Sequence, residues 1–554
     1  SKNTDDNCYH VFYHPEGLGV TTKTLIDGFT ITGGNADGEG EHGHGAAFYN
    51  IQNHVKFFNM TIQDNEALGN GAGFYFEHSF PELENCIIKQ NSAMAGAAIF
   101  AADSTHLTLV NCLIADNQAS SGGAGIKAVT STGEIINATI VGNESAGNGG
   151  GIALLDGSDF DFKNSIVYLN EAVSGNQLFM QESSGANLVF SCYSNETNDI
   201  VSLSGSVFNP ASGTTQQNPR FVDVTGGDYR LAGNSGLLDA GQDQYNITLT
   251  DVRGKGYPRK MKKTSLTTGN IDMGAFEYQA GNDFPNWIMF VKEGATGKGN
   301  GYTWTDALTT LQPALSIAIS GDIIWIAAGT YKPSATAGGS ADRFKTFQLK
   351  NFVSVVGGFA GDETIYFDLT QRNFTENETI LTGDLNGNDN YEVTPWTGMD
   401  ENCYHVFRHN GIGLTNTAIL DGVTVSGGNA SVWGDHFGPG MQNMYNSSPT
   451  IRYCKFTHNT TVGNGGGIYN YVTCSPVIDH CLITNNIALS NGGGIFSHTS
   501  CNPVISNTII SDNSTTYHGG GICNENYTTS TITNCVISGN ICQWFGGGIY
   551  YESY

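Results

Sequence analysis

Basic residues are scarce in this chain. Its 554 residues include 24 lysines and arginines against 51 aspartates and glutamates, which gives a formal net charge of −27. Proteins that bind nucleic acids need clustered positive charge to replace the counterions of the phosphate backbone. The composition therefore excludes nucleic acid as a partner and is typical of a soluble acidic protein.

Long apolar runs and paired cysteine motifs are also missing. No stretch approaches the roughly 18 apolar residues of a membrane span, so we expect none in this segment. The opening SKNTDDNCYH has no signal-like apolar stretch, which fits a cleaved signal or a longer natural chain. The 12 cysteines contain no C-x-x-C and are too sparse for a disulfide scaffold. They favour free thiols and no metal site.

Glycine is abundant, and it recurs in one phrase at a fixed interval. The phrases VGNGGGIYN, LSNGGGIFS, TYHGGGICN and QWFGGGIYY place four isoleucines 27 residues apart, at Ile468, Ile495, Ile522 and Ile549. A second phrase ends in an asparagine at the same interval, at Asn459, Asn486, Asn513 and Asn540. The first half of the chain has five such asparagines at intervals of 26 or 27, at Asn65, Asn91, Asn117, Asn143 and Asn170.

Each column of this alignment has a physical meaning. The residue eight before the asparagine is always apolar, and those five and three before it share one face of a strand. Several residues at the fifth position are cysteines, such as Cys86 and Cys454, and should point inward. The sixth position is usually another asparagine and marks a corner. Cys474 and Cys501 form a second stacked pair, for which a disulfide is the alternative to two thiols.

These columns predict an all-β fold. Short strands with Gly and Asn corners, in units of 26 to 27 residues, indicate a parallel β-helix. Its coils stack about 4.8 Å apart, so equivalent asparagines should lie above one another and exchange hydrogen bonds. Asparagine also tolerates the left-handed backbone of a sharp corner.

The GGGI phrase has a structural and a functional interpretation. Structurally, its glycines lie at a tight bend, where φ is positive or neighbouring backbones approach closely, and its isoleucine enters the core. The alternative is a phosphate-binding loop. That loop needs a following helix and usually a lysine, and neither is present.

A longer period lies above the coils. NCYHVF begins at Asn7 and again at Asn402, and LIDGFTITGGNA at Leu25 returns as ILDGVTVSGGNA at Ile419. The chain therefore holds parts of two copies of one module and is expected to be a piece of a longer protein. We expect β-helix coils at 1–205, a terminal region at 206–280, an entry cap with first coils at 281–400, and second-module coils at 401–554.

A single helix is predicted, and it lies in the entry segment. Helical spacing relates Leu308, Leu311, Leu315, Ala318 and Ile319, and Gly321 suits the helix end. Such a short capping helix could cover the open end of the β-helix. The following DIIWIAAGTY is expected to form the first buried strand.

These segments resemble a known family. GATGKGNGYTWTDALTTLQPALSIAISGDIIWIAAGTYKP and LDGVTVSGGNA are similar to secreted right-handed β-helix proteins of the pectin-lyase-like superfamily. DYRLAGNSGLLDAG with IDMGAFEY resembles the choice-of-anchor Q region, although here that region is internal. The coils resemble the repeats of chlamydial polymorphic outer-membrane proteins. The resemblance implies a right-handed β-helix, export to the cell surface and adhesion.

The same superfamily contains pectin-cleaving enzymes, whose residues are largely missing. NTDD at Asn3 to Asp6 and GHG at Gly43 to Gly45 are similar to polygalacturonase motifs, but the Arg-x-Lys signature is absent. The second copy has GMDEN and WGDHFGPG at the matching places, so neither motif belongs to the module. We therefore assign no catalytic residues.

Two segments are candidates for binding. GDLNGNDNYE places Asp384, Asn386 and Asn388 at alternate positions, as a calcium loop does, but Pro395 stands where a glutamate is expected. Calcium is the only cofactor suggested, and a polar surface turn is the alternative. RGKGYPRKMKK, residues 253–263, concentrates positive charge that could contact an anionic glycan or a neighbouring module, or simply be solvated.

The sequence thus predicts an extracellular structural or adhesive protein of a bacterial cell surface. Its expected partners are glycans, cell-surface components or like modules, with self-association into filaments included. The alternative is a polysaccharide-active lyase or hydrolase. Three or more carboxylates clustered beside an Arg or Lys on an exposed sheet face would favour the enzyme.

Overall fold

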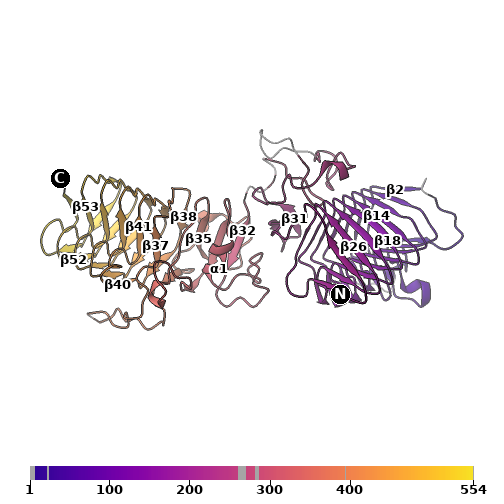
Figure 1. Ribbon diagram of the computed structural model, residues 1–554, viewed down its shortest axis with the longest axis horizontal. Helices are drawn as coiled ribbons and strands as arrows, with labels where there is room; N and C mark the ends of the chain where they lie inside the picture. The colour runs from indigo at the N-terminus through magenta and orange to yellow at the C-terminus, as the bar shows by residue number, and fades with distance from the viewer. Residues whose placement is uncertain are drawn as a thin grey trace. The chain divides into compact units, whose positions relative to one another are not determined.

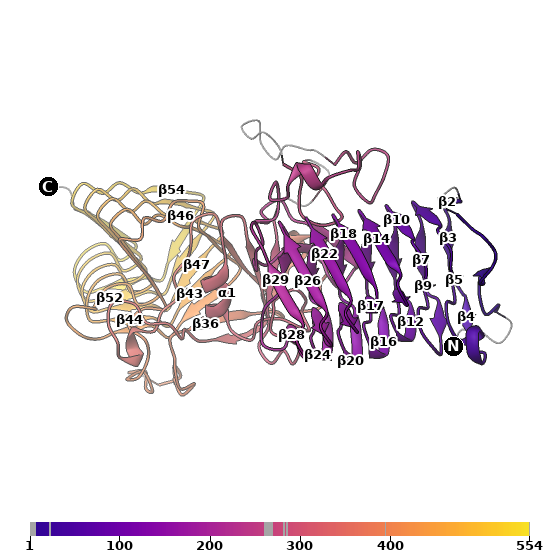
Figure 2. The same ribbon diagram turned by 45° about the vertical axis from the view of Figure 1, so that its right-hand side comes forward.

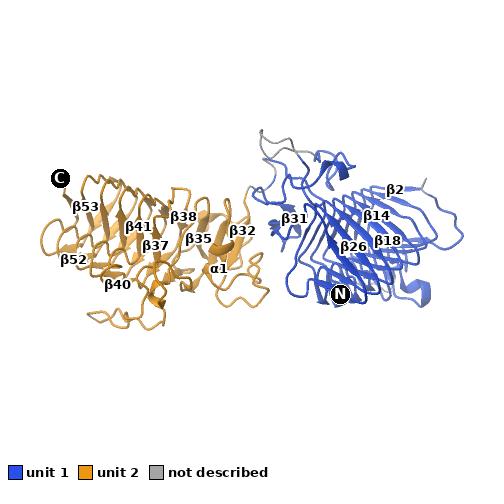
Figure 3. Ribbon diagram, viewed as in Figure 1, with its two compact units in different colours: residues 1–285 blue, residues 286–554 orange. Residues whose placement is uncertain are grey.

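The computed structural model describes residues 7–21, 24–259, 270–280, 283, 286–393 and 395–552. The chain divides into two compact units, residues 1–285 and 286–554 (Figure 3). The division lies close to the expected change of module at 280/281. The predicted boundaries inside each unit remain predictions.

Each unit is a parallel β-helix whose coils contribute strands to four sheets (Figures 1 and 2). Sheets 1 to 4 are numbered in the order in which the chain visits them, and the same numbers apply to both units. Between the four sheets the chain turns at four corners per coil that recur from coil to coil, as at Gly71, His78, Asn85 and Gln90, which all have positive φ. Because every strand pairs with the equivalent strand of the next coil, the repeat of the sequence becomes a repeat in space.

The strands of the first unit are as follows. Sheet 1 contains β1 (Phe12–His14), β5 (Phe48–Ile51), β9 (Phe74–Glu77), β13 (Ile99–Ala102), β17 (Ile126–Val129), β21 (Ile152–Leu155), β25 (Leu178–Met180) and β28 (Ile200–Ser202). Sheet 2 contains β2 (Leu25–Asp27), β6 (Lys56–Phe58), β10 (Glu82–Glu84), β14 (His106–Val110), β18 (Thr132–Ile136), β22 (Asp159–Lys163), β26 (Gly185–Val189) and β29 (Val207–Pro210). Sheet 3 contains β3 (Thr30–Ile31), β7 (Thr61–Gln63), β11 (Ile87–Lys89), β15 (Leu113–Ala115), β19 (Thr139–Val141), β23 (Ile166–Tyr168) and β27 (Cys192–Tyr193). Sheet 4 contains β4 (Asn35–Ala36), β8 (Glu66–Ala67), β12 (Ser92–Ala95), β16 (Gln118–Gly122), β20 (Glu144–Asn148) and β24 (Glu171–Ser174). The unit also has the hairpin β30 (Phe221–Asp223) and β31 (Asp228–Leu231), and the 3-10 turns η1 (Gly40–Gly43) and η2 (Asp243–Tyr245).

The second unit repeats this plan. Sheet 1 contains β37 (Phe407–Asn410), β41 (Met441–Met444), β45 (Ile468–Tyr471), β49 (Ile495–His498), β53 (Ile522–Glu525) and β57 (Ile549–Glu552). Sheet 2 contains β32 (Ile288–Val291), β33 (Ile323–Ala327), β35 (Ser354–Phe359), β38 (Ile419–Asp421), β42 (Thr450–Arg452), β46 (Val477–Asp479), β50 (Val504–Ser506) and β54 (Thr531–Thr533). Sheet 3 contains β34 (Gly329–Tyr331), β36 (Thr379–Thr382), β39 (Thr424–Ser426), β43 (Lys455–Thr457), β47 (Leu482–Thr484), β51 (Ile509–Ser511) and β55 (Val536–Ser538). Sheet 4 contains β40 (Asn429–Ala430), β44 (Thr460–Thr461), β48 (Ile487–Ala488), β52 (Ser514–Thr515) and β56 (Ile541–Cys542). The unit also has α1 (Leu311–Ile317) and the 3-10 turns η3 (Asp342–Phe344) and η4 (Leu369–Gln371).

The core follows from the register. In sheet 1 of the second unit, Ile468 pairs with Ile495, and Ile495 pairs with Ile522. All three side chains are fully buried. Parallel pairing in this register places like residues on like residues, so each apolar column of the sequence becomes a continuous file inside the solenoid.

The asparagines form the predicted ladder at the corner between sheets 3 and 4. In the second unit, Nδ2 of one residue donates to Oδ1 of the next along Asn459, Asn486, Asn513 and Asn540, over 3.0, 2.9 and 3.0 Å. In the first unit the same bonds run along Asn65, Asn91, Asn117, Asn143 and Asn170, over 3.0, 3.0, 2.8 and 2.9 Å. The predicted single column of stacked asparagines is confirmed.

The left-handed backbone at this corner belongs to the residue before each ladder asparagine. His458, Asn485 and Asp512 have φ of 54°, 53° and 56°, and the ladder residues are not among the left-handed positions. The expectation that the ladder asparagine itself adopts this conformation is therefore wrong, because its role is to turn inward and bond. The predicted corner six residues before the ladder is confirmed, since Asn59 and Asn85 there have φ of 53° and 55°.

The glycines of GGGI serve both predicted purposes. The first glycine has a left-handed backbone, as at Gly465 (φ 70°) and Gly492 (φ 67°). The second and third lie against the next coil: a Cβ on Gly466 would lie 2.4 Å from the carbonyl oxygen of Gly493. The GGGI glycines therefore have a structural role. The phrase is followed by a strand rather than by the helix of a phosphate-binding loop.

The capping helix is shorter than predicted. Helix α1 covers Leu311–Ile317 and buries Leu311, Ala314 and Leu315. Leu308 instead bridges to Val291, and Ile319 is 45 % exposed. The helix stops early because Ala318 has an extended ψ of 137° and Asp322 accepts a hydrogen bond from the backbone of Ile319. Strand β32 precedes the helix, so DIIWIAAGTY supplies the second strand of sheet 2, not the first. Whether α1 acts as a lid remains a prediction.

The terminal region of the first module folds back along its own coils. Asn111 and Asn164, in the corner column between sheets 2 and 3, donate to the backbone carbonyls of Thr250 and Gln242. Tyr229 of β31 donates its hydroxyl to Asp116. This region therefore covers part of that corner in the first unit.

All 12 cysteines are free thiols. Nine are buried, Cys474 and Cys501 among them, and the backbone N–H of Cys474 donates to Sγ of Cys501. No helix among the described residues has the length and apolar character needed to cross a bilayer.

Candidate functional site

The corner between sheets 2 and 3 differs between the two units. In the first unit it carries asparagines from Asn59 to Asn164. In the second unit the equivalent column has Tyr453 and His480 before asparagine returns at Asn507, whereas Gly422 before them matches Gly28 of the first unit. The sequence predicts asparagine in most of this column, and the departures at Tyr453 and His480 are the sequence signal that could have identified the site.

An open groove of about 550 Å³ lies over this corner of the second unit. It passes between the ends of β46 and β47, which are labelled in Figure 2. Its lining combines aromatic, charged and hydroxyl side chains with the ends of apolar strands. The lining residues include Phe374, Thr375, Glu378, Thr424, Tyr453, Lys455, His480, Leu482, Asn507 and Ile509.

Three rings form a file along the groove. The centroids of Phe374 and Tyr453 are 6.0 Å apart with planes at 20°, and those of Tyr453 and His480 are 5.0 Å apart at 26°. Phe374 is 37 % and Tyr453 42 % exposed. Tyr453 and His480 adopt the left-handed corner conformation, with φ of 53° and 51°. The step from one coil to the next thus sets the spacing of Tyr453 and His480.

Phe374 is held in place from beneath. The Arg372 guanidinium lies 5.0 Å from the Phe374 ring centroid, and its Nη2 donates to buried Asp421 at 2.8 Å. A Cβ on Gly422 would lie 2.7 Å from this ring, so only glycine leaves room for it. Arg452 also donates to Asp421, at 2.5 Å. The aromatic surface is therefore fixed before any ligand arrives.

Polar groups border the rings. Lys455 Nζ lies 3.8 Å from Glu378 Oε1, and the two side chains are 43 % and 41 % exposed. Thr424 donates its hydroxyl to the same Glu378 oxygen at 2.7 Å. A flat apolar surface beside exposed donors and acceptors suits ligands that have an apolar face and many hydroxyl groups.

Of the two polygalacturonase-like motifs, only GHG lies within the part of the chain that the structure describes. NTDD, residues 3–6, lies outside the described residues. In GHG, His44 Nδ1 accepts a hydrogen bond from the backbone of Asn70 at 2.8 Å, and burial lowers the pKa of this imidazole. His44 is therefore occupied in joining neighbouring coils.

The basic segment is only partly a surface loop. Arg253 donates to Asp251 and Asp283 at the terminal region, and Arg259 is fully buried beside Glu277. Residues 260–263 of the segment lie outside the described residues. Contact with a glycan through this segment remains a prediction.

The predicted calcium loop contains an acidic cluster. Asp384 Oδ1 accepts hydrogen bonds from the backbone amides of Asn386 and Asn388, at 3.2 and 3.3 Å. Asp384 lies with Asp389 and Glu401, each offering an oxygen within 4.8 Å of the others. The alternation pattern missed Asp389, which it skips, and Glu401, which follows later in GMDEN. The roles predicted for the Asn386 and Asn388 side chains remain predictions.

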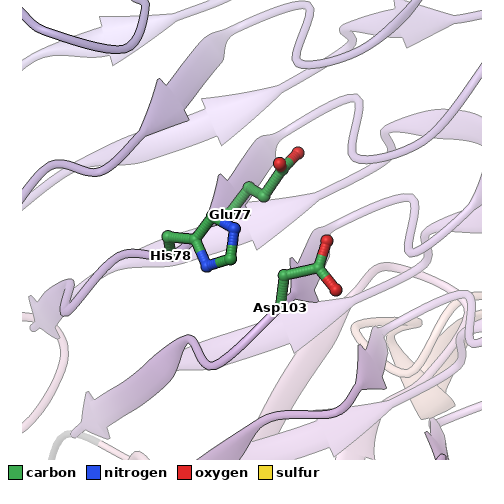
Figure 4. Close-up of side chains that lie close together, drawn as sticks. All are labelled: Glu77, His78 and Asp103. Carbon is green, nitrogen blue, oxygen red and sulfur yellow. The ribbon is translucent and has the colours of Figure 1, made fainter.

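A second group of ionisable residues lies on the first unit. Glu77, His78 and Asp103 come from neighbouring coils and offer ligand atoms within 4.8 Å of one another (Figure 4). His78 and Asp103 are exposed at left-handed corners, and Tyr75 donates to Glu77. Water competes freely at such a position, so these residues form an open surface cluster.

Comparison with known proteins supports the fold. The family model described as right handed beta helix region matches residues 6–144 and 440–554. No curated protein matches the sequence. These matched residues are similar to that family, and together with the stacked parallel coils they support the predicted right-handed parallel β-helix fold.

Proposed function

We propose that the chain is a structural and adhesive part of a bacterial surface protein, and that the groove of its second unit binds glycans. The observation that carries this proposal is the exposed file of Phe374, Tyr453 and His480. Pyranose rings stack on aromatic faces, and their hydroxyls bond to charged and polar neighbours. The Glu378–Lys455 pair and Thr424 supply such neighbours.

Extracellular display belongs to the same proposal. The β-helix fold is consistent with surface or polysaccharide-related proteins, and a net charge of −27 suits a soluble exposed chain. Like modules or other cell-surface components are further proposed partners. The groove is the feature that favours glycans among them.

The test uses variants that restore the asparagine of the other coils. Tyr453→Asn and His480→Asn remove the rings without straining the left-handed corner, because asparagine tolerates that conformation. On an array of neutral and acidic glycans we expect the double variant to lose binding at least about tenfold, the loss expected from removing stacking contacts.

Tyr527→Asn is the matched control. Tyr527 is also a left-handed corner tyrosine, with φ of 59°, and is 69 % exposed, but it does not line the groove. This variant should bind like the parent chain. Equal binding by the double variant, with an unchanged fold by circular dichroism, would refute the groove as the glycan site.

Polysaccharide cleavage is the second candidate. It is favoured by the amine of Lys455 and the carboxylate of Glu378, which line the groove together. Incubation with acidic and neutral polysaccharides, followed by assay of reducing ends and unsaturated products, separates the two functions. Products that disappear in Lys455→Ala would establish the enzyme, whereas binding without products supports adhesion.

A further inference from the structure

The acidic cluster of the second unit brings three carboxylates close together. Asp384, Asp389 and Glu401 each place an oxygen within 4.8 Å of the others. Asp384 is 9 % exposed, and the other two are half-buried. Among the described residues no Lys, Arg or His forms an ion pair with any of the three. Three carboxylates this close repel one another unless a cation lies between them.

Three buried oxygens of this site have no hydrogen-bond partner among the described residues. They are Asp389 Oδ1, Glu401 Oε1 and Asn402 Oδ1. Asn402 is fully buried, and its Nδ2 donates to Asp389 Oδ2 at 2.8 Å and to the carbonyl of Gly427 at 2.7 Å. These two acceptors fix the orientation of the amide, which leaves Oδ1 as its unpaired atom, on the same amide group that contacts Asp389. A buried acceptor without a partner is costly, so the arrangement itself points to a ligand.

Hydrogen bonds fix the orientation of the Asp384 and Asp389 carboxylates, and with it the direction of their remaining lone pairs. The Asp384 carboxylate is held by four backbone amides of its own loop, including that of Asp389 at 3.2 Å. Asp389 Oδ2 accepts from the Tyr391 hydroxyl at 2.5 Å as well as from Asn402. Burial, together with the charges of Asp384 and Glu401, raises the pKa of Asp389 to about 6, against the lowering effect of these hydrogen bonds.

We propose that Asp384, Asp389, Glu401 and Asn402 bind one Ca²⁺. All four offer oxygen, the ligand that calcium requires, and none offers the nitrogen or sulfur that zinc prefers. Calcium also accepts irregular geometry, whereas Mg²⁺ demands a near-ideal octahedron. The cluster joins the loop after β36 to the segment before β37. Calcium would therefore tie the first coils of the second unit together, independently of glycan binding.

Terbium luminescence provides the direct test. Tb³⁺ replaces Ca²⁺ at oxygen sites and is excited by nearby aromatic rings. Tyr391 bonds to Asp389, and the Trp396 ring centroid lies 5.4 Å from that of Tyr391. We expect sensitised emission from the full chain, displaced by Ca²⁺ with a Kd on the order of 0.1 to 1 mM and more weakly by Mg²⁺. Absence of emission, or displacement by Mg²⁺ and Ca²⁺ alike, would overturn the proposal.

Variants identify the ligands. Glu401→Gln should weaken Ca²⁺ affinity at least about tenfold, because it removes one of three anionic ligands. Without calcium the same variant should melt no lower than the parent chain, since it also removes repulsion. A purely structural glutamate would instead lower the melting temperature with or without calcium, with no change in affinity. That result would refute the site.

Two controls separate this site from general acidity. Glu392→Gln removes an exposed carboxylate from the same loop, and Glu77→Gln disrupts the open cluster of the first unit. Neither should change the calcium affinity or the terbium emission. Loss of the signal in Glu77→Gln would assign the ion to the first unit and contradict our proposal.

Discussion

Buried amides are where single residues matter most in this protein. A buried asparagine is costly unless both ends of its amide are bonded. The ladder meets this requirement because Asn486 accepts from Asn459 and donates to Asn513, and its Nδ2 also reaches the carbonyl of Phe456. Each member thus depends on the coils on both sides.

His409 provides a residue-scale prediction on pH. Burial lowers its pKa from 6.5 to about 4, and its Nδ1 bonds Asn443 while its Nε2 accepts from the backbone of Leu349. Because the neutral ring is the folded form, the unfolded chain binds the proton more readily. Stability is therefore full above pH 6.5 and falls as the pH drops towards 4, by roughly 3 kcal/mol in total.

The measurement is the difference in urea unfolding between the parent chain and His409→Gln over this pH range. The variant should lose this part of the pH dependence, whereas His480→Gln, which changes a half-exposed ring, should keep it. Parallel profiles for the parent chain and His409→Gln would show that the histidine is not linked to folding.

At the scale of the coil, the glycine phrase sets how closely neighbours stack. In Gly466→Ala the new Cβ would lie 2.4 Å from the carbonyl oxygen of Gly493 and 2.9 Å from that of Ile487. Both atoms are backbone, so the coils must separate, and we expect a loss of about 3 kcal/mol in the free energy of unfolding.

Gly547 occupies the same place in the last coil and gives the control. A Cβ there would meet only the carbonyl oxygen of Asn540, at 3.1 Å. Gly547→Ala should therefore cost much less than Gly466→Ala in thermal or chemical unfolding. A similar cost for both would mean that local backbone preference, and not contact between coils, explains the glycines.

The coils could be predicted because their physics is periodic. One coil determines where the next places its isoleucine, its asparagine and its glycines, so a few columns suffice. The cap could not be predicted in the same way: the helical spacing from Leu308 to Ile319 is a local signal, and tertiary contacts at Leu308 and Asp322 overrode it at both ends. Of the acidic cluster only Asp384 was found. Asp389 and Glu401 come close to Asp384 because the chain folds back, and no local sequence pattern indicates this.

Across the whole molecule, the thiols report how completely the solenoid excludes solvent. Cys8 is exposed, Cys535 and Cys542 are half-buried, and the other nine cysteines are buried. Native alkylation followed by mass spectrometry should label Cys8 first, the half-buried pair more slowly, and the rest only after unfolding, because reaction needs an accessible thiolate. Denaturation without reductant should then give twelve labelled sites. Two missing labels at Cys474 and Cys501 would reveal a disulfide instead.

The corner between sheets 2 and 3 has a different role in each of the two units. The first covers its asparagine column with the terminal region, through Thr250 and Gln242. The second leaves Tyr453 and His480 open along a groove. The same scaffold position therefore serves packing in one copy and is available for recognition in the other.

The asparagine ladder has an evolutionary consequence. Each rung receives from one neighbour the bond that it gives to the other, so an inserted or deleted coil of 27 residues would leave every remaining rung with its partners. Gene duplication could thus lengthen or shorten such an array in steps of about 4.8 Å without redesigning any part of it. The length of the solenoid would then vary by whole coils between related proteins, while the residues of the groove stayed the same.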